Sequence, residues 1–165
     1  RFEHIGGGKL ARKLARRAER LGLGGRVRWR GARPQQDVVA ALRDADLFVL
    51  ASRIAEDGDR DGLPNVLMEA QSQGLCCLAT RTAAIPELIE HAATGMLVPA
   101  ADPAALAEAL SLLIRDPALR AAYGEAGQHR TRGYFGMAAG IDRLAAKFGL
   151  LQEPGRLLAR HDLGV

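Results

Sequence analysis

Short apolar runs alternate with amphipathic segments over residues 1–98 of the chain. The runs at 47–50 and 75–79 are continuously apolar, which is typical of strands that a sheet buries on both faces. In the run at 26–30 apolar and charged residues alternate, so Val27 and Trp29 are expected to point inward. The predicted strands are residues 1–5, 26–30, 47–50, 75–79 and 96–98. The predicted helices between them are residues 9–21, 34–44, 64–73 and 85–91.

Two Asp-Pro pairs predict where later helices begin. An Asp at the cap followed by Pro in the first turn suits a helix start, because the missing Pro N–H has no intrahelical partner there. We therefore expect one helix from Asp102-Pro103 to Arg115 and another from Asp116-Pro117 to about His129. Residues 135–148 are predicted as a further helix. Residues 151–165 are predicted to be a loose tail or a helix that packs on an absent partner.

The alternation of strands and helices predicts the fold class. It is an α/β fold with a Rossmann-like, doubly wound parallel sheet, in one domain over residues 1–150 and a tail over 151–165. Ligands bind such sheets beyond the carboxyl ends of the strands. That rule gathers four loops at one edge of the sheet: residues 6–8, 31–33, 52–65 and 80–85.

The net charge of +4 accompanies two arginine-rich runs, residues 12–20 and 26–33. The first run shares its predicted helix with an apolar face of Leu10, Leu14, Ala18 and Leu21. A solvated surface accounts for the charge, and attraction to a nucleotide diphosphate or to an anionic membrane is the alternative. Aromatic residues do not interleave the basic ones, so a base-stacking platform for nucleic acid is not expected.

Cys76 and Cys77 are the only cysteines of the chain. Neighbouring strand residues point to opposite faces, so both are predicted to pack as reduced hydrophobic side chains. The chain shows neither a signal peptide nor an apolar run of membrane-spanning length. We therefore predict a cytoplasmic protein, either free or peripheral at the inner face of the membrane.

The segment Asp61-Gly62-Leu63-Pro64-Asn65, four residues before Glu69, is the strongest candidate for a site. Gly62 allows the backbone to approach a ligand closely, and Pro64 suits the first turn of a helix. The free N–H groups and the positive end of the helix dipole attract an anion. Asp61 lies before the helix and Glu69 lies inside it, so both carboxylates can border one cleft.

This segment resembles the E-x7-E signature of the GT-B retaining glycosyltransferases of family 4. The chain has D-G-L-P-N-V-L-M-E-A, followed by I-P-E-L-I, by G-M-L-V-P and by an Asp-Pro helix start, in the order of that family. Asp61 departs from the pattern, because it is one methylene shorter than the usual Glu. Ala83 and Ala84 replace a glycine pair that is frequent in the family, so we expect the 80–86 loop to avoid positive φ.

The resemblance implies a role for each matching residue. Glu69 would hold the nucleotide ribose, and Asp61, the residue near the reacting carbon, would hold hydroxyls of the donor hexose. Gly62, Leu63, Pro64 and Asn65 would form the cradle for the sugar or phosphate, and Arg33 would stack on the base. Members of this kind use no metal or other cofactor, and an Arg-Lys pair that precedes the first strand of this chain neutralises the diphosphate.

The function implied by the resemblance is transfer of a hexose from a nucleotide diphosphate sugar to a glycan, lipid or small-molecule acceptor, with retention. This chain would be the donor-binding half of the two-domain GT-B architecture, without its first strand and without the acceptor-binding N-terminal domain. We therefore expect the isolated chain to be inactive and the full-length protein to be the enzyme. The base, the hexose and the acceptor are not predicted.

Three other interpretations stay open. Gly6 to Ala11 fit the G-x-G-x-x-A dinucleotide fingerprint, and Arg30 and Arg33 could serve an NADP-binding oxidoreductase domain. Residues 57–62 resemble the start of a calcium loop, although its twelfth position is Met68 and not the required Glu, so no metal site is predicted. The chain could also be a non-catalytic nucleotide-binding or assembly module, in which a second copy supplies a missing strand and gives a homodimer.

Overall fold

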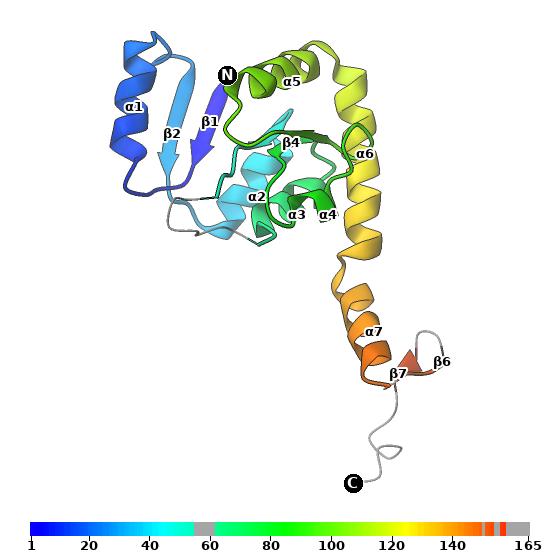
Figure 1. Ribbon diagram of the computed structural model, residues 1–165. Coiled ribbons are helices and arrows are strands. Elements are labelled where there is room, and N and C mark those ends of the chain that lie inside the picture. Colours follow the sequence, from blue (N-terminus) through cyan, green and yellow to red (C-terminus); the bar gives the residue numbers. More distant parts are fainter. Residues whose placement is uncertain (55–61, 150, 154–155, 158–165) are drawn as a thin grey trace. The chain divides into compact units, whose positions relative to one another are not determined.

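The chain forms two compact units in a computed structural model that describes residues 1–54, 62–149, 151–153 and 156–157 (Figure 1). The first unit is residues 1–44 and the second is residues 45–165. The predicted division between a domain of residues 1–150 and a tail stays a prediction. Each unit is built from parallel strands joined by helices, apart from a short antiparallel pair near the C-terminus.

The first unit contains two parallel strands, each followed by a helix. The unit is held at its surface by an ion pair between Glu3 and Arg30, 2.8 Å long, and by the rings of His4 and Trp29, whose centroids are 5.1 Å apart. The Arg30 guanidinium donates a hydrogen bond to Glu3 and lowers the pKa of that carboxyl. The elements are β1 (Phe2–Ile5), α1 (Ala11–Arg20), β2 (Val27–Gly31) and α2 (Gln35–Arg43).

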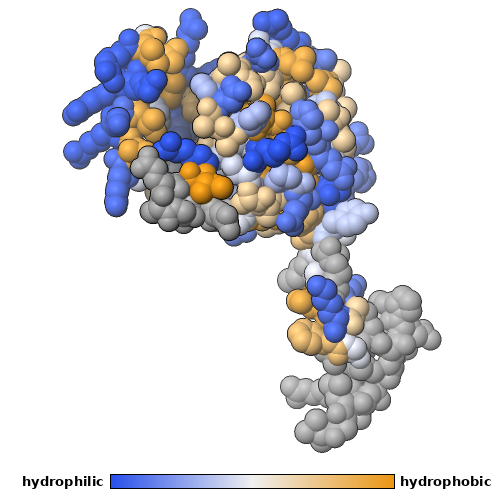
Figure 2. Space-filling model, viewed as in Figure 1, coloured by the Kyte–Doolittle hydropathy of each residue, from blue (hydrophilic) through white to orange (hydrophobic). Residues whose placement is uncertain are grey.

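Helix α1 buries a different part of its apolar face from the one expected. Ala18 is buried at 8% exposure, whereas Leu10 and Leu14 are 58% and 44% exposed. Hydrophilic side chains cover the outward surface of α1 (Figure 2). The inward prediction for Trp29 was wrong, because its side chain is 37% exposed.

The second unit is organised around a parallel sheet in the order β3-β4-β5. Helix α3 contacts β3 and β4, and α5 contacts β5. The predicted α/β, Rossmann-like fold class is confirmed. The elements are β3 (Phe48–Leu50), α3 (Asn65–Ser72), β4 (Cys77–Thr80), α4 (Ile85–Leu88), β5 (Met96–Val98), α5 (Pro103–Arg115), α6 (Pro117–Tyr134), α7 (Met137–Lys147), β6 (Leu151–Glu153) and β7 (Arg156–Leu157).

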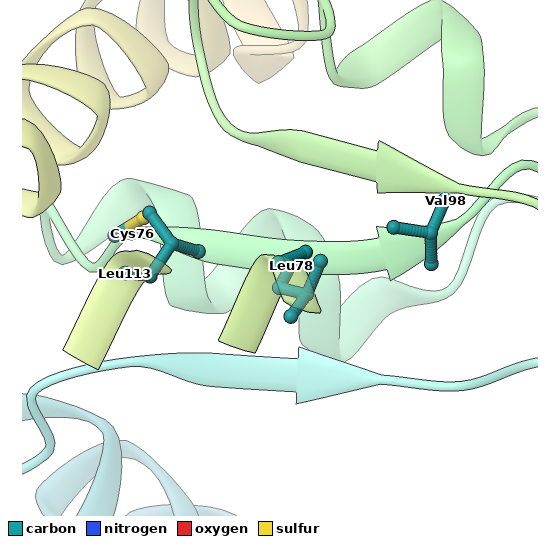
Figure 3. Close-up of a cluster of buried hydrophobic side chains, with 5 residues drawn as sticks. Cys76, Leu78, Val98 and Leu113 are labelled. Carbon is teal, nitrogen blue, oxygen red and sulfur yellow. The ribbon is translucent and has the colours of Figure 1, made fainter. Parts of the chain in front are cut away.

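The core of the second unit lies on both faces of β4. Cys76 and Leu78 join Val98 and the α5 residue Leu113 in one buried cluster (Figure 3). Alternation along the strand directs Cys77 and Ala79 to the other face, and both are fully buried. Strand β3 was expected to be buried on both faces but is only half-buried. Within the three-stranded sheet β3 pairs with β4 alone, so it lies at the edge of that sheet.

Both Asp-Pro helix starts are confirmed. The Asp102 carboxylate accepts a hydrogen bond from the Ala105 N–H, and the Asp116 carboxylate accepts one from the Leu119 N–H, both 2.9 Å long. Helix α6 continues past the predicted end at His129 to Tyr134. The prediction of a loose or helical tail was wrong for the part of 151–165 that the structure describes, because β6 and β7 pair antiparallel there.

Two glycines of α6 let this helix approach α3 and the segment that links α3 to β4. A Cβ at Gly124 would overlap the carbonyl oxygen of Gly74, and one at Gly127 would lie 2.8 Å from Gln71 Nε2. Gln71 is fully buried and donates to the Thr94 carbonyl at 2.9 Å. Any larger side chain would therefore push α6 away from α3.

Gly124→Ala is expected to lower the free energy of unfolding by roughly 1–3 kcal/mol, because the new methyl group meets backbone that cannot move aside. Gly133→Ala is the matched control, since nothing lies within 4 Å of the Cβ added there. That variant is expected to gain up to about 1 kcal/mol from helix propensity. Urea unfolding of both variants checks the pair, and equal effects would contradict the close approach.

The two cysteines are buried and unpaired, as predicted. Burial raises the pKa of the Cys76 thiol from its ordinary value of 9.0 to about 11. Burial also raises the pKa of Cys77 well above 9.0, and the neighbouring Cys76 adds to that rise. Both thiols are therefore protonated and unreactive in the folded protein at neutral pH.

This burial predicts alkaline sensitivity. Above pH 9.0 the thiols of the unfolded chain ionise, while in the folded chain Cys76 keeps its proton until about pH 11 and Cys77 keeps its proton well above pH 9.0. The free energy of unfolding is thus at its full value below pH 9.0 and falls as the pH rises toward 11. Urea unfolding across this pH range should show that the free energy of unfolding falls less steeply in a variant with both Cys76→Ala and Cys77→Ala than in the unaltered protein. An identical fall in both proteins would assign the effect to other groups.

Candidate functional site

The loops that follow β3 and β4 meet at the carboxyl edge of the three-stranded sheet. The Thr80 hydroxyl, at the end of β4, donates to the Ser52 carbonyl beyond the end of β3. The Ala84 N–H donates to the Gly62 carbonyl at 3.3 Å, which joins the segment before α4 to the segment before α3. The second unit therefore assembles this edge from two loops that lie 20 or more residues apart in sequence.

Helix α3 begins with open backbone amides. Pro64 stands at its cap with φ −65° and ψ 121°, and no side chain of the described residues caps the helix there. The first amides of a helix have no intrahelical acceptor, so those of Asn65 and Val66 point out of the helix start. Partial positive charge collects at this end through the helix dipole. The geometry suits an anionic group bound above Gly62 to Asn65.

Glu69 lies one turn inside α3, on the same side as Asn65. Its side chain is half-buried, and none of the described residues hydrogen bonds to its carboxylate. Its backbone carbonyl accepts a bond of 2.7 Å from the Ser72 hydroxyl. A carboxylate that has lost part of its water without gaining a partner is an acceptor available for ligand hydroxyls.

The loop before α4 holds a strained residue that the sequence did not predict. Ala83 has φ +46°, although the Ala-Ala pair was expected to avoid positive φ. This left-handed conformation brings Cβ close to the backbone, which is why glycine usually occupies it. The strain stands next to Ala84, whose N–H bonds to Gly62.

The structure brings together most of the residues predicted for the site. Gly62, Leu63, Pro64, Asn65 and Glu69 form one continuous segment of the second unit. Asp61 and the acidic residues 57 and 59 lie outside the described residues. Arg33 belongs to the first unit, where its exposed side chain donates to the Arg30 carbonyl at 3.0 Å.

A polar network that the sequence did not predict lies behind the segment. Gln71 Oε1 accepts a bond of 3.0 Å from the Thr131 hydroxyl, while Gln71 Nε2 donates to the Thr94 carbonyl. Gln71 is fully buried, and Thr131 is 6% exposed. The available signal was a Gln four residues after Leu67, on the inward face of α3, because a buried amide requires partners from elsewhere in the chain.

The described residues offer neither a cluster of metal ligands nor a membrane-spanning helix. Within residues 1–54 and 62–149 and the short pieces beyond, no group of three or more His, Cys, Asp or Glu side chains is arranged to hold a metal ion. None of the helices in that part of the chain is both long and apolar enough to cross a membrane.

Parallel strands with helices on both faces, and a loop-to-helix segment at their carboxyl edge, define a Rossmann-like α/β domain of the kind found in GT-B glycosyltransferases. Residues 2–130 match the family described as "Glycosyl transferases group 1", and the chain belongs to that family.

Two curated relatives come from polysaccharide biosynthesis. The putative colanic acid biosynthesis glycosyltransferase WcaL of Escherichia coli is 40% identical over 111 residues, 67% of this chain and 27% of the relative. The amylovoran biosynthesis glycosyltransferase AmsK of Erwinia amylovora is 43% identical over 96 residues, 58% of this chain and 22% of the relative. The chain thus spans about a quarter of the length of these relatives.

A solved structure shares the fold. Anabaena Alr3699/HepE in complex with UDP superposes with a TM-score of 0.78 at 23% identity, over 90% of this chain and 40% of that one. At this identity the likeness establishes the fold.

Ala83→Gly is expected to raise the free energy of unfolding by about 0.5–1 kcal/mol, since glycine adopts positive φ without a steric penalty. Ala107→Gly, at an exposed position of α5, is the matched control and should lose roughly 1 kcal/mol. Thermal or urea unfolding of both variants checks that the free energy of unfolding rises in Ala83→Gly and falls in Ala107→Gly. A loss of stability in Ala83→Gly would show that the loop does not hold this conformation.

Proposed function

We propose that the chain is the C-terminal, donor-binding half of a retaining GT-B glycosyltransferase of family 4. The observation that supports this proposal most strongly is the environment of Glu69 in a chain of the group 1 family. Its carboxylate is half-buried, lies one turn inside α3 and has no partner among the described residues. Vicinal hydroxyls of a ribose match the two oxygens of a carboxylate. Glu69 binds the ribose of the donor nucleotide.

The segment before α3 receives the rest of the donor. The amides of Asn65 and Val66 face the diphosphate or the sugar, and Gly62 and Leu63 line the approach. Asp61 binds hydroxyls of the hexose next to the reacting carbon, and Arg33 stacks on the base. The donor is held without a metal ion, by backbone amides and by cations of the full-length protein.

The proposed reaction moves a hexose from a nucleotide diphosphate to an acceptor hydroxyl. The bond between the anomeric carbon and the diphosphate oxygen breaks, and a bond from that carbon to the acceptor oxygen forms on the same face. The acceptor proton leaves with the nucleoside diphosphate. The residues described here bind and orient the donor, so the isolated chain turns over no substrate.

The acceptor belongs to a polysaccharide, a lipid or a small molecule. Two relatives are named for colanic acid and amylovoran biosynthesis. Another, from Mycolicibacterium smegmatis, is named as a mannosyltransferase of a phosphatidylinositol monomannoside. A lipid-linked acceptor would bring the full-length protein to the inner membrane face, where the cations of α1 would favour anionic headgroups.

Calorimetric titration of the chain and of the full-length protein with UDP, GDP and ADP tests the proposal. One nucleotide is expected to bind selectively. Glu69→Ala should weaken the binding of that nucleotide about 10–100-fold, because hydrogen bonds to a charged group contribute roughly 1.5–3 kcal/mol. Glu108→Ala, which removes an exposed carboxylate of α5, is the control and should bind as the unaltered protein does.

Equal nucleotide affinity in the Glu69→Ala and unaltered full-length proteins would contradict the role of Glu69. Absence of binding by the full-length protein to all three nucleotides would contradict the donor-binding function itself. Binding by the full-length protein alone would agree with diphosphate contacts from outside this chain.

A further inference from the structure

Helix α6 donates side-chain hydrogen bonds to the C-terminal ends of both helices that begin at the site. Gln128 Nε2 donates to the Ser72 carbonyl at the end of α3, at 3.0 Å. Arg130 Nε and Nη2 donate to the Leu88 and Glu87 carbonyls at the end of α4, both at 2.9 Å. The last carbonyls of a helix have no intrahelical donor, so these bonds satisfy groups that would otherwise need water.

Arg130 is held in place on three sides. Besides its two carbonyl partners, it forms an ion pair with Glu90 and lies 5.5 Å from the ring centre of Tyr134. Only 23% of its side chain is exposed. The planar guanidinium presents its donors in a fixed fork, so the end of α4 is fixed in both position and direction.

A short path leads from Arg130 to the site. Helix α4 is a single turn, from Ile85 to Leu88, and Ala84 stands at its cap. The Ala84 N–H donates to the Gly62 carbonyl at the start of the candidate site. One turn of helix moves as a rigid piece, so a displacement of the Leu88 carbonyl displaces Ala84 and with it Gly62.

We propose that Arg130 is a positioning residue for the donor site. It anchors the end of α4, and through the Ala84–Gly62 hydrogen bond it fixes the backbone that precedes α3. Arg130 itself touches no ligand. The inference rests on the proposed function for the nature of the ligand, but the anchoring is a property of the protein alone.

Helix α6 supplies a matched control. Arg120 Nη1 donates to the Leu113 and Ile114 carbonyls, at 2.6 and 3.1 Å. These carbonyls end α5, whose residue Leu113 packs on the sheet beside Leu78. Arg120 and Arg130 thus make the same kind of bond from the same helix, and only Arg130 bonds to a helix that begins at the site.

Hydrogen–deuterium exchange of the full-length protein, followed by mass spectrometry, tests the proposal without a ligand. In Arg130→Ala the amides of residues 81–85 should exchange up to about tenfold faster than in the unaltered protein, as loss of a hydrogen bond in the folded state predicts. In Arg120→Ala the faster exchange should be confined to residues 112–120. Unchanged exchange at 81–85 in Arg130→Ala, or an equal rise there in Arg120→Ala, would overturn the proposal.

Two further variants separate the carbonyl bonds from the ion pair. Glu90→Gln removes the charge partner and leaves the fork of Arg130 to the carbonyls intact, so exchange at 81–85 should stay as in the unaltered protein. Arg130→Lys keeps the charge but cannot span both carbonyls, so exchange should rise as in Arg130→Ala. The reverse pattern would assign the effect to the ion pair and overturn the positioning role.

The same proteins are titrated with UDP, GDP and ADP, using the nucleotide that the unaltered protein binds best. Arg130→Ala should weaken the binding of this nucleotide about fivefold to tenfold. Arg120→Ala should lower the melting temperature by a similar amount but leave the affinity unchanged. Failure of the proposed function appears separately, as absence of binding of all three nucleotides to the unaltered full-length protein. In that event exchange at 81–85 still decides the role of Arg130.

Discussion

The contact between Gly124 of α6 and the Gly74 carbonyl is the constraint on which the second unit depends. It permits an approach that any side chain would prevent, and it brings Gln128, Arg130 and Thr131 within reach of α3 and α4. The sheet alone would fix only the starts of these helices. Because α6 also holds their ends, the loops between strand and helix are fixed from both sides.

The sequence predicts the elements of the fold well because their signals are local. The Asp-Pro pairs mark the starts of α5 and α6, and continuous or alternating apolar patterns mark the predicted strands. The apolar face of α1 was misjudged for a physical reason. A pattern ranks Leu14 with Ala18 on one face, whereas the burial of each depends on tertiary contacts that the pattern does not contain.

The same difference between local and long-range signals applies to the candidate site. Gly62 to Glu69 are contiguous, so a motif could identify them and the structure keeps them together. The bonds from α6 link residues 42 to 60 positions apart, and no periodicity reveals such pairs. The left-handed conformation of Ala83 was also missed, because a composition without glycine argued against it. Tertiary contacts decide the backbone there, as they often do at functional loops.

The long-range bonds of α6 have a consequence for biosynthesis. Gln128 follows its acceptor Ser72 by 56 residues, so the ribosome completes both site loops before it makes the helix that secures them. At roughly 5–20 residues per second the interval is about 3–11 seconds. A nascent chain therefore carries an unsecured version of the site for that time, and the final geometry is set by residues translated long after the site itself.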